Sequence, residues 1–465
     1  MTPKKSLKLG TPLLSNTQLA AYAGPQAILF LTRVASFGII PALYAEKFDI
    51  TLDKIAGILI LMRFAEAILQ LVVGQLTDLT ARGKLNRKVW VISGTILAAV
   101  GLWFLYSPPA NAGLVYLAVW LGVVTLVGSA TDVAYLSWGA EITTDYAERG
   151  KVATVQQWAA IAGQVIFFGI PLLPLTPTSE ITFEALGLIA IIVAVSTPFI
   201  IFLAYKLAPI GNPGAESERP TLTSLAKAIL ANRPMQVLVV GGMFFDIAAS
   251  VAVGIGFLFI DSYLAAGEYV PYQGLTQMAG AFIGISLAGF FLLRFQKHHV
   301  WAASAFIYCG VMLLALFLTP DMAYAGLVYV GITTMAYLVA MGAVVAPNSI
   351  IGDVVDYERW RSGAQQSGQF VAAFQLTQKL VGGLAGALGF YLLAQFGFEP
   401  GQDSYDSQAT TGIKLVAVIL PAGLMAFSGF IALRFPLNRK AQETVRRRLY
   451  QRDERFRRDQ KETVS

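Results

Sequence analysis

The feature that most constrains this fold is a series of twelve apolar runs that together occupy most of the 465-residue chain. A helix rises 1.5 Å per residue, so about 20 apolar residues are enough to cross the hydrocarbon core of a bilayer. Only 13% of the residues are charged, whereas a soluble domain carries about 25%. The sequence therefore predicts an all-α, multi-pass integral membrane protein with twelve transmembrane helices. The expected spans are 18–46, 54–78, 88–107, 113–138, 151–175, 185–205, 236–264, 271–294, 299–318, 323–350, 366–397 and 411–434.

The long polar connection between the sixth and seventh runs divides the chain six plus six. Its prolines and glycine interrupt any continuous helix; they are Pro209, Pro213, Gly214, Pro220 and Pro234. We expect an N-terminal six-helix half at 1–205, a central loop at 206–235, a C-terminal half at 236–434 and a tail at 435–465.

The two halves also carry similar short motifs after their fourth runs, at 145–150 (DYAERG) and 356–361 (DYERWR). A parallel repeat of two six-helix halves, related by a pseudo-twofold axis, is typical of the major facilitator fold.

Charge in the loops predicts the orientation. Lys and Arg concentrate after the second, fourth, eighth and tenth runs and in the central loop, whereas the opposite loops hold mostly acids. The positive-inside rule then places both termini in the cytoplasm, which fits a bacterial inner membrane. The Arg-rich tail is expected to be a solvated helix near anionic headgroups, not a nucleic-acid arm. We expect lipid bilayer and a small-molecule substrate as partners, no nucleic acid, and a monomer.

The second run places three polar residues on one face of its helix. Arg63, Glu66 and Gln70 are spaced three and four residues apart, so Arg63 can pair with Glu66. Charged groups at this depth are costly and usually functional. This face is where we expect a coupling site.

Charges near the expected midplane balance. Three cations are matched by three acids, as burial in a low-dielectric interior requires; they are Arg33, Arg63 and Lys379 against Glu66, Asp132 and Asp246. Two interpretations of Arg33 stay open. It can lock the first helix to Asp246 or Asp132, or it can meet an anionic group on the substrate through a forked pair of hydrogen bonds.

Three segments resemble one known family. They are RFAE at 63–66 with GQLTD at 74–78, DVAY at 132–135 with EIT at 141–143, and DVVDYE at 353–358 followed by Gly363, Gly368 and Lys379. All three are similar to the glycoside–pentoside–hexuronide:cation symporters, the family of the melibiose permease. The resemblance implies a major facilitator fold and cation-coupled transport of a sugar, glycoside or hexuronide.

The family's functional positions carry over unevenly. The resemblance places the cation site at Glu66 and Gln70, where sodium-using relatives have two aspartates. It also assigns Asp132, with Ser129 nearby, to the shared sugar and cation region, and it matches the family's helix-eleven lysine with Lys379. The family's sugar-binding aspartate and arginine, however, fall on Gln26 and Gln157.

The functional hypothesis is secondary active symport by alternating access, with a proton favoured over sodium because only one carboxylate occupies the expected cation site. Burial disfavours the charged form of a lone glutamate, which suits a group that takes up and releases a proton. The alternatives are a lysophospholipid-like or other amphiphile transporter of the same fold, or a non-transporting receptor. An enzyme, a cofactor and a metal site are not expected.

The expected site residues form three groups. Cation coupling is assigned to Glu66, Gln70, Asp132, Ser129 and Arg63. Substrate binding is assigned to Gln26, Arg33, Asp132, Tyr135, Gln157, Lys379 and Asp246. A cytoplasmic gate is assigned to Asp78, Arg82, Glu141, Arg149, Asp356 and Arg359.

Overall fold

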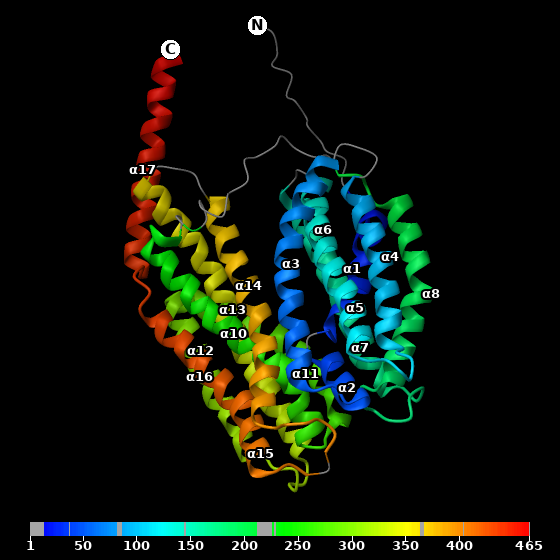
Figure 1. Cartoon of the computed structure of the whole chain (residues 1–465). Helices are drawn as coiled ribbons and strands as arrows, with labels where there is room; N and C mark the ends of the chain where they lie inside the picture. Colours follow the sequence, from blue (N-terminus) through cyan, green and yellow to red (C-terminus); the bar gives the residue numbers. More distant parts are fainter. Residues whose placement is uncertain are drawn as a thin grey trace. The chain divides into compact units, whose positions relative to one another are not determined.

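Helices make up all the regular secondary structure in the described part of this computed structural model (Figure 1). The described residues are 14–36, 38–80, 86–143, 146–211, 226, 229–362, 367–402 and 404–464. The chain separates into two units, Met1–Ser217 and Glu218–Ser465. Each unit is described by itself.

The first unit contains eight α-helices among its described residues. They are α1 (Asn16–Val34), α2 (Ile39–Phe48), α3 (Leu52–Thr80), α4 (Arg87–Tyr106), α5 (Leu114–Gly122), α6 (Gly128–Ile142), α7 (Tyr146–Gly169) and α8 (Phe183–Leu207). A π-helical turn, η1 (Val123–Val127), joins α5 to α6, and a short 3-10 turn, η2 (Ile170–Leu172), follows α7.

The second unit continues the helical pattern from α10 onward. Its α-helices are α10 (Arg233–Leu258), α11 (Val270–Arg294), α12 (Lys297–Leu313), α13 (Ala325–Ser362), α14 (Ser367–Gln395), α15 (Ser407–Lys414), α16 (Leu420–Leu433) and α17 (Arg439–Val464). Two π-helical turns, η3 (Phe259–Tyr263) and η6 (Leu415–Ile419), extend α10 and join α15 to α16. The 3-10 turns are η4 (Gly267–Tyr269) and η5 (Leu314–Phe317).

The described helices include 11 that are long and apolar enough to cross a membrane, or 12 if the bent pair α1 and α2 forms one span. The sequence predicted a single uninterrupted run at 18–46, but α1 and α2 meet at an angle of 44°. Gly38 precedes α2, and Pro41 lies in its first turn. Proline is tolerated in a first turn because the amide N–H groups there have no helical partner. The local sequence is therefore suited to restarting the helix.

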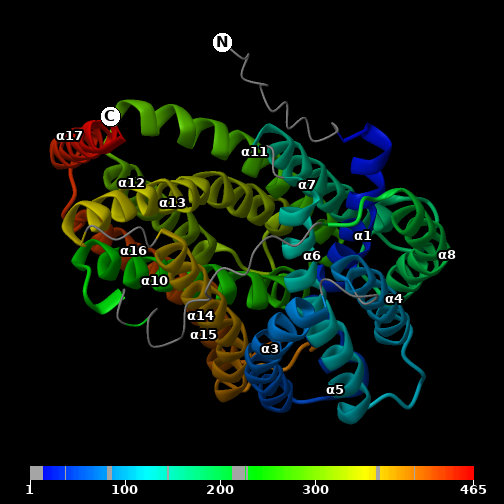
Figure 2. The ribbon, with the colours of Figure 1, turned by 90° about the horizontal axis from the view of Figure 1, so that it is seen from above.

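Helix α6 is held tightly among its neighbours in the first unit. It contacts α1, α3, α4 and α7, as the end-on view in Figure 2 shows. A methyl group on Gly94 of α4 would overlap the hydroxyl of Thr131 on α6, so only glycine allows this approach of the two helices. Tyr22, Tyr135 and Trp138 complete a buried aromatic cluster between α1 and α6.

The core of the second unit is centred on Trp301 of α12. Its indole N–H donates to Ser428 Oγ on α16 (3.2 Å), and that hydroxyl donates to the Gly241 carbonyl on α10 (2.8 Å). The polar ends of these buried side chains are thus satisfied, as burial requires. Phe370 and Phe374 of α14 pack into the same cluster.

Helix α13 is longer than its predicted span of 323–350. Its 38 residues reach about 57 Å at 1.5 Å per residue, whereas the hydrocarbon core is about 30 Å thick. The charged segment from Asp353 onward is therefore the last part of this helix and not a loop after it. In the first unit, by contrast, Tyr146 and Glu148 of the similar motif open α7.

The tail forms α17, which is helical as the sequence predicted but is not solvated on all sides. Val445 and Leu449, one turn apart, are only 8% and 6% exposed, and α17 packs on α13. Arg446 bonds to both Asp353 (3.2 Å) and Asp356 (3.4 Å) of α13. This docking explains how the charged end of α13 is held in helical form.

Candidate functional site

The polar face predicted on α3 forms a connected cluster that reaches α6. Arg63 donates to Glu66 Oε2 (2.7 Å), and the amide nitrogen of Gln70 donates to Glu66 Oε1 (3.4 Å). The same nitrogen donates to Ser129 Oγ on α6 (2.5 Å). The two charged side chains are 18% exposed each, so both are largely enclosed by protein. Four of the five residues assigned to cation coupling therefore meet in one place.

A π-helical turn immediately precedes the α6 end of this cluster. Residues 123–127 form η1, and Ser129 and Asp132 follow on the next turn of α6. Such turns insert an extra residue, change which face the following side chains occupy, and are frequent at functional sites. Ser129 is directed toward α3, where it meets Gln70. Nothing in the apolar sequence of this run (VVTLV) predicted the turn.

Asp132, one turn beyond Ser129, pairs with Arg33 of α1. The same guanidinium also donates through Nε to the Leu29 carbonyl (3.0 Å), which fixes its direction. Of the two acids considered as partners of Arg33, the structure selects Asp132. The side chains of Arg33 and Asp132 are 29% and 33% exposed, so the ion pair borders an accessible space.

The amide side chains assigned to substrate binding lie on α1 and α7. Gln156 donates to Gln26 Oε1 (3.4 Å) across these two helices, and Gln157, the next residue of α7, is exposed. Trp158 follows with 59% of its surface exposed. α1 thus carries both Gln26 and Arg33, and a row of polar groups extends from the ion pair toward α7.

Tyr135 is placed in the core rather than at an accessible surface. It is 1% exposed, its hydroxyl donates to the Tyr22 carbonyl (2.6 Å), and its ring stacks on Tyr22 at a centroid distance of 4.9 Å. The ring and the hydroxyl of Tyr135 are therefore occupied by protein contacts, and the ring is not available for stacking on a substrate. Trp138 lies beside it, fully buried, with its indole N–H on the Pro209 carbonyl (3.0 Å).

The expected charged cluster of the second unit is described only in part. Asp246 of α10 has a buried carboxylate oxygen, Oδ2, to which no described group donates a hydrogen bond. Lys379 lies on α14, but its side chain is outside the described residues. Whether the two share one balanced cluster stays a prediction.

The described gate residues find partners that the sequence did not assign. Glu141 of α6 pairs with Arg87 at the start of α4, and Asp356 pairs with Arg446 of the tail (3.4 Å). The Arg359 carbonyl accepts a hydrogen bond from Arg452 (3.0 Å). Arg82 lies outside the described residues, as do the side chains of Asp78 and Arg149.

The sequence missed three cations as specific partners of acids: Arg87 in the first unit and Lys297 and Arg446 in the second. Lys297 donates to Asp353 Oδ2 at 2.5 Å, and Asp353 is only 2% exposed. In the sequence, these three cations counted only as part of the general enrichment of Lys and Arg on one side of the membrane. Such a count predicts the orientation of the helices but not which acid each cation contacts.

Comparison with known proteins identifies the family. The model for the family described as MFS/sugar transport protein matches residues 21–439, most of the chain. The chain belongs to this family. Its members are transporters and not enzymes, and the resemblance drawn from the sequence motifs to major facilitator symporters is confirmed.

Individual relatives of this MFS transporter are distant but matched over most of their length. The uncharacterized symporter YjmB of Bacillus subtilis (strain 168) is 24% identical over 390 residues, 81% of this chain and 82% of that protein. The inner membrane symporter YicJ of Escherichia coli (strain K12) is 24% identical over 408 residues, 84% and 85% of the two chains.

Solved structures confirm the fold. The nucleoside transporter NupG aligns with a TM-score of 0.64 at 14% identity, covering 90% of this chain and 98% of NupG. The xylose transporter XylE from E. coli aligns with a TM-score of 0.62 at 12% identity, covering 92% and 98%. The predicted multi-pass, all-α major facilitator fold is therefore correct.

Proposed function

We propose that this MFS transporter is a proton-coupled symporter of a sugar, glycoside or hexuronide that works by alternating access. The observation that carries the proposal is the arrangement around α6. Within two turns this helix offers Ser129 to the Arg63–Glu66–Gln70 cluster of α3 and Asp132 to Arg33 of α1. A coupling group and a substrate-facing ion pair on the same short segment can affect each other directly.

The proposed coupling group is Glu66. In the structure it accepts hydrogen bonds from both Arg63 and Gln70. A proton on Glu66 removes the charge that holds Arg63, while the carbonyl oxygen of the neutral group can still accept from Gln70. Proton binding thereby weakens the ion pair beside the Gln70–Ser129 link between α3 and α6. The substrate, bound beside Asp132, favours the arrangement of α3 and α6 that the proton on Glu66 also favours. Because both ligands stabilise the same arrangement, binding of one strengthens binding of the other.

The contacts of Gln70 support a proton over sodium. Its amide nitrogen is directed at both Glu66 and Ser129, so the residue brings hydrogen-bond donors to the place where a metal cation needs oxygen atoms. One carboxylate that already accepts from a guanidinium offers little further negative charge. A proton needs only one acceptor oxygen.

The family description and the polar groups of α1 and α7 support a carbohydrate substrate. Sugar hydroxyl groups both donate and accept, and they suit amides and ionised side chains such as Gln26, Gln157 and Asp132. Trp158, exposed beside Gln157, offers the flat apolar surface on which a sugar ring can stack. The names of the matched relatives, which include two symporters, agree with coupled transport.

The experiment is counterflow and uptake in proteoliposomes with a panel of neutral sugars, glycosides, hexuronides and lysolipids. We expect saturable counterflow of at least one carbohydrate, accumulation driven by an imposed pH gradient, and no change when choline replaces sodium. Counterflow of lysolipids alone would favour the amphiphile alternative, and saturable stimulation by sodium at constant pH would overturn the proposed coupling ion. Binding without counterflow of any compound would favour a receptor.

A further inference from the structure

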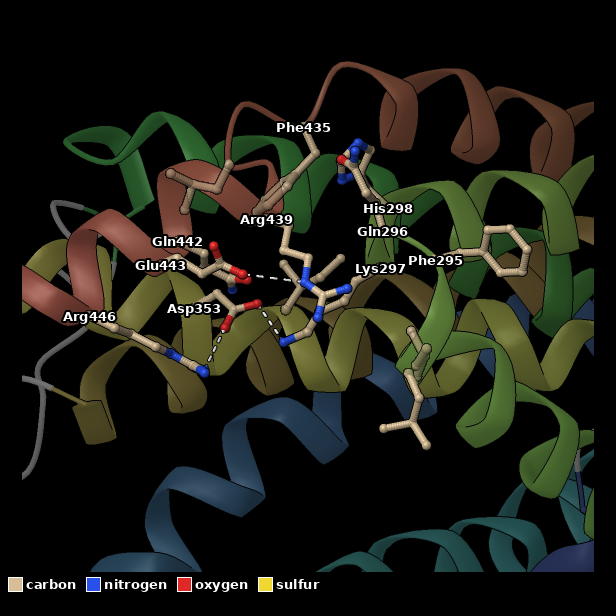
Figure 3. Close-up of a pocket in the computed structure, with 14 residues that line it drawn as sticks. Phe295, Gln296, Lys297, His298, Asp353, Phe435, Arg439, Gln442, Glu443 and Arg446 are labelled. Atoms are coloured by element: carbon tan, nitrogen blue, oxygen red, sulfur yellow. Dashed lines mark hydrogen bonds and ion pairs between the residues drawn. The ribbon is translucent and has the colours of Figure 1, made fainter.

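A cavity of about 280 Å³, lined by both charged and apolar side chains, lies in the second unit where α11 ends and α12 begins (Figure 3). α11 ends at Arg294 and α12 begins at Lys297, and both are candidate membrane spans, so their junction lies at a membrane–water boundary. α13 and the first two turns of α17 close the cavity with Asp353, Arg439 and Arg446. This position is outside the site proposed for transport.

The described lining of the cavity has more cationic than anionic groups. Lys297, Arg439 and Arg446 face two acids, Asp353 and Glu443; Figure 3 shows the ion pairs that join them. Asp353 is shared by Lys297 and Arg446, and Arg446 also bonds to Asp356 of α13. Arg439, with Glu443 at 3.4 Å, is 67% exposed, so its guanidinium is the group through which the cavity can bind an anion.

His298 provides an independent indication of a ligand. It lines the same cavity and is 6% exposed, yet no described group hydrogen-bonds to either ring nitrogen. Its ring contacts are with His299 and Phe435. A buried imidazole normally finds a hydrogen-bond partner, and an anion in the cavity would supply one.

An apolar groove of about 430 Å³ continues from the cavity along α11, α12 and α13. Phe295 lines both spaces, and the cavity residue His298 is followed by the groove residues His299 and Val300. The groove runs from His299 to Ile307 of α12, nine residues and a rise of roughly 12 Å. That is most of one leaflet of the hydrocarbon core. Ile307 and Phe291 are 53% and 41% exposed, so the groove faces the membrane.

We propose that cavity and groove together form a binding site for an anionic phospholipid. Its phosphate occupies the cavity near Arg439, Lys297 and His298, and one acyl chain lies along the groove. A free anion accounts for the cavity alone, and an uncharged chain accounts for the groove alone. Only an anionic amphiphile uses the exposed guanidinium of Arg439, the His298 imidazole and the adjoining apolar surface at once.

The test measures lipid binding to the full-length protein by native mass spectrometry after delipidation and titration with phosphatidylglycerol or phosphatidylcholine. We expect phosphatidylglycerol to bind about tenfold more tightly, the difference made by one charge-assisted contact. Arg439→Gln should remove most of this preference. Arg447→Gln, an exposed arginine of α17 outside the cavity, is the matched control and should keep it.

The groove is tested with Ala303→Trp, which places a large side chain in it from an exposed position of α12. This change should weaken phosphatidylglycerol binding several-fold, whereas Leu314→Trp, also membrane-exposed but outside the groove, should not. Equal affinity for the two lipids, or equal effects of Arg439→Gln and Arg447→Gln, would overturn the proposal. Competition by inorganic phosphate together with an inactive Ala303→Trp change would assign the cavity to a free anion instead.

Discussion

Arg33 on α1 and Asp132 on α6 form an ion pair whose side chains keep 29% and 33% of their surface exposed. An ion pair that borders an accessible space can join two helices and also meet a substrate. The two interpretations of Arg33 derived from the sequence are therefore not exclusive. Arg33 holds α1 to α6 and still presents part of its guanidinium.

The first prediction separates these roles with a double-mutant cycle of Arg33→Gln and Asp132→Asn. Each single change leaves one charge without its partner, and the double change removes both. We expect a coupling energy between about 0.5 and 3 kcal/mol in unfolding midpoints measured in detergent. Glu184→Gln, an exposed acid of α8, is the control. Recovered stability without recovered uptake in the double variant would assign the pair to substrate binding, and absence of coupling would contradict the ion pair.

The second prediction concerns Lys88, which is 7% exposed. Its ammonium donates to the carbonyls of Tyr205 (2.7 Å) and Ala208 (2.6 Å), at the end of α8 where the last carbonyls have no helical partner. Lys88→Met keeps the apolar stem and removes both bonds, so we expect a loss of about 1–3 kcal/mol in stability. Thermal unfolding in detergent measures it. Lys206→Met, at an exposed position of α8, should have little effect, and equal losses in the two variants would refute the prediction.

The sequence predicted those parts of the site that depend on local spacing. Arg63 and Glu66 are three residues apart on one helix, so their pairing follows from helical geometry alone. The partner of Arg33 could not be predicted from the sequence, because Asp132 and Asp246 are both distant from it in sequence and only the packing of the helices decides between them. Tyr135 was assigned to substrate binding from its position beside Asp132, but the buried cluster with Tyr22 could not be derived from spacing.

The helical fold was predictable because long apolar runs dominate the chain. The errors in the predicted helix boundaries occur where a helix is not apolar or not continuous. The end of α13 is charged and resembled a loop, and its helical form depends on α17, whose Arg446 bonds to Asp353 and Asp356. The break between α1 and α2 lies inside an apolar run, where hydropathy does not report a change of direction.

The third prediction changes the coupling ion through Gln70. Gln70→Glu replaces an amide donor with a second carboxylate next to Glu66 and Ser129, and this restores the two-acid arrangement that the family resemblance associates with sodium. Two adjacent carboxylates repel each other unless a cation or a proton lies between them. We expect uptake by the variant to rise with sodium concentration at constant pH, whereas wild-type uptake should not. Gln75→Glu, at an exposed position of the same helix, is the matched control, and the same sodium response in both would refute the argument.

The last prediction identifies the proton-binding group. Glu66→Gln keeps the size of the side chain and its ability to bond Gln70, but it cannot exchange a proton. Net accumulation against a gradient requires that exchange, whereas counterflow of substrate between two compartments does not. We therefore expect Glu66→Gln to retain counterflow and to lose accumulation driven by a pH gradient. For one proton per substrate, a difference of one pH unit supports about tenfold accumulation in the wild type, and the variant should fall to about onefold.

Glu66→Gln also removes the acid that pairs with Arg63, and loss of this pair can lower activity by destabilising the fold. The double variant Glu66→Gln with Arg63→Gln removes both charges of the pair and controls for this effect. If the pair is mainly structural, the double variant should regain pH-driven accumulation along with stability. If Glu66 carries the proton, the double variant should regain stability and counterflow but still not accumulate substrate. Accumulation by Glu66→Gln equal to that of the wild type would exclude Glu66 as the coupling group and direct attention to Asp132, the acid paired with Arg33 one turn beyond Ser129.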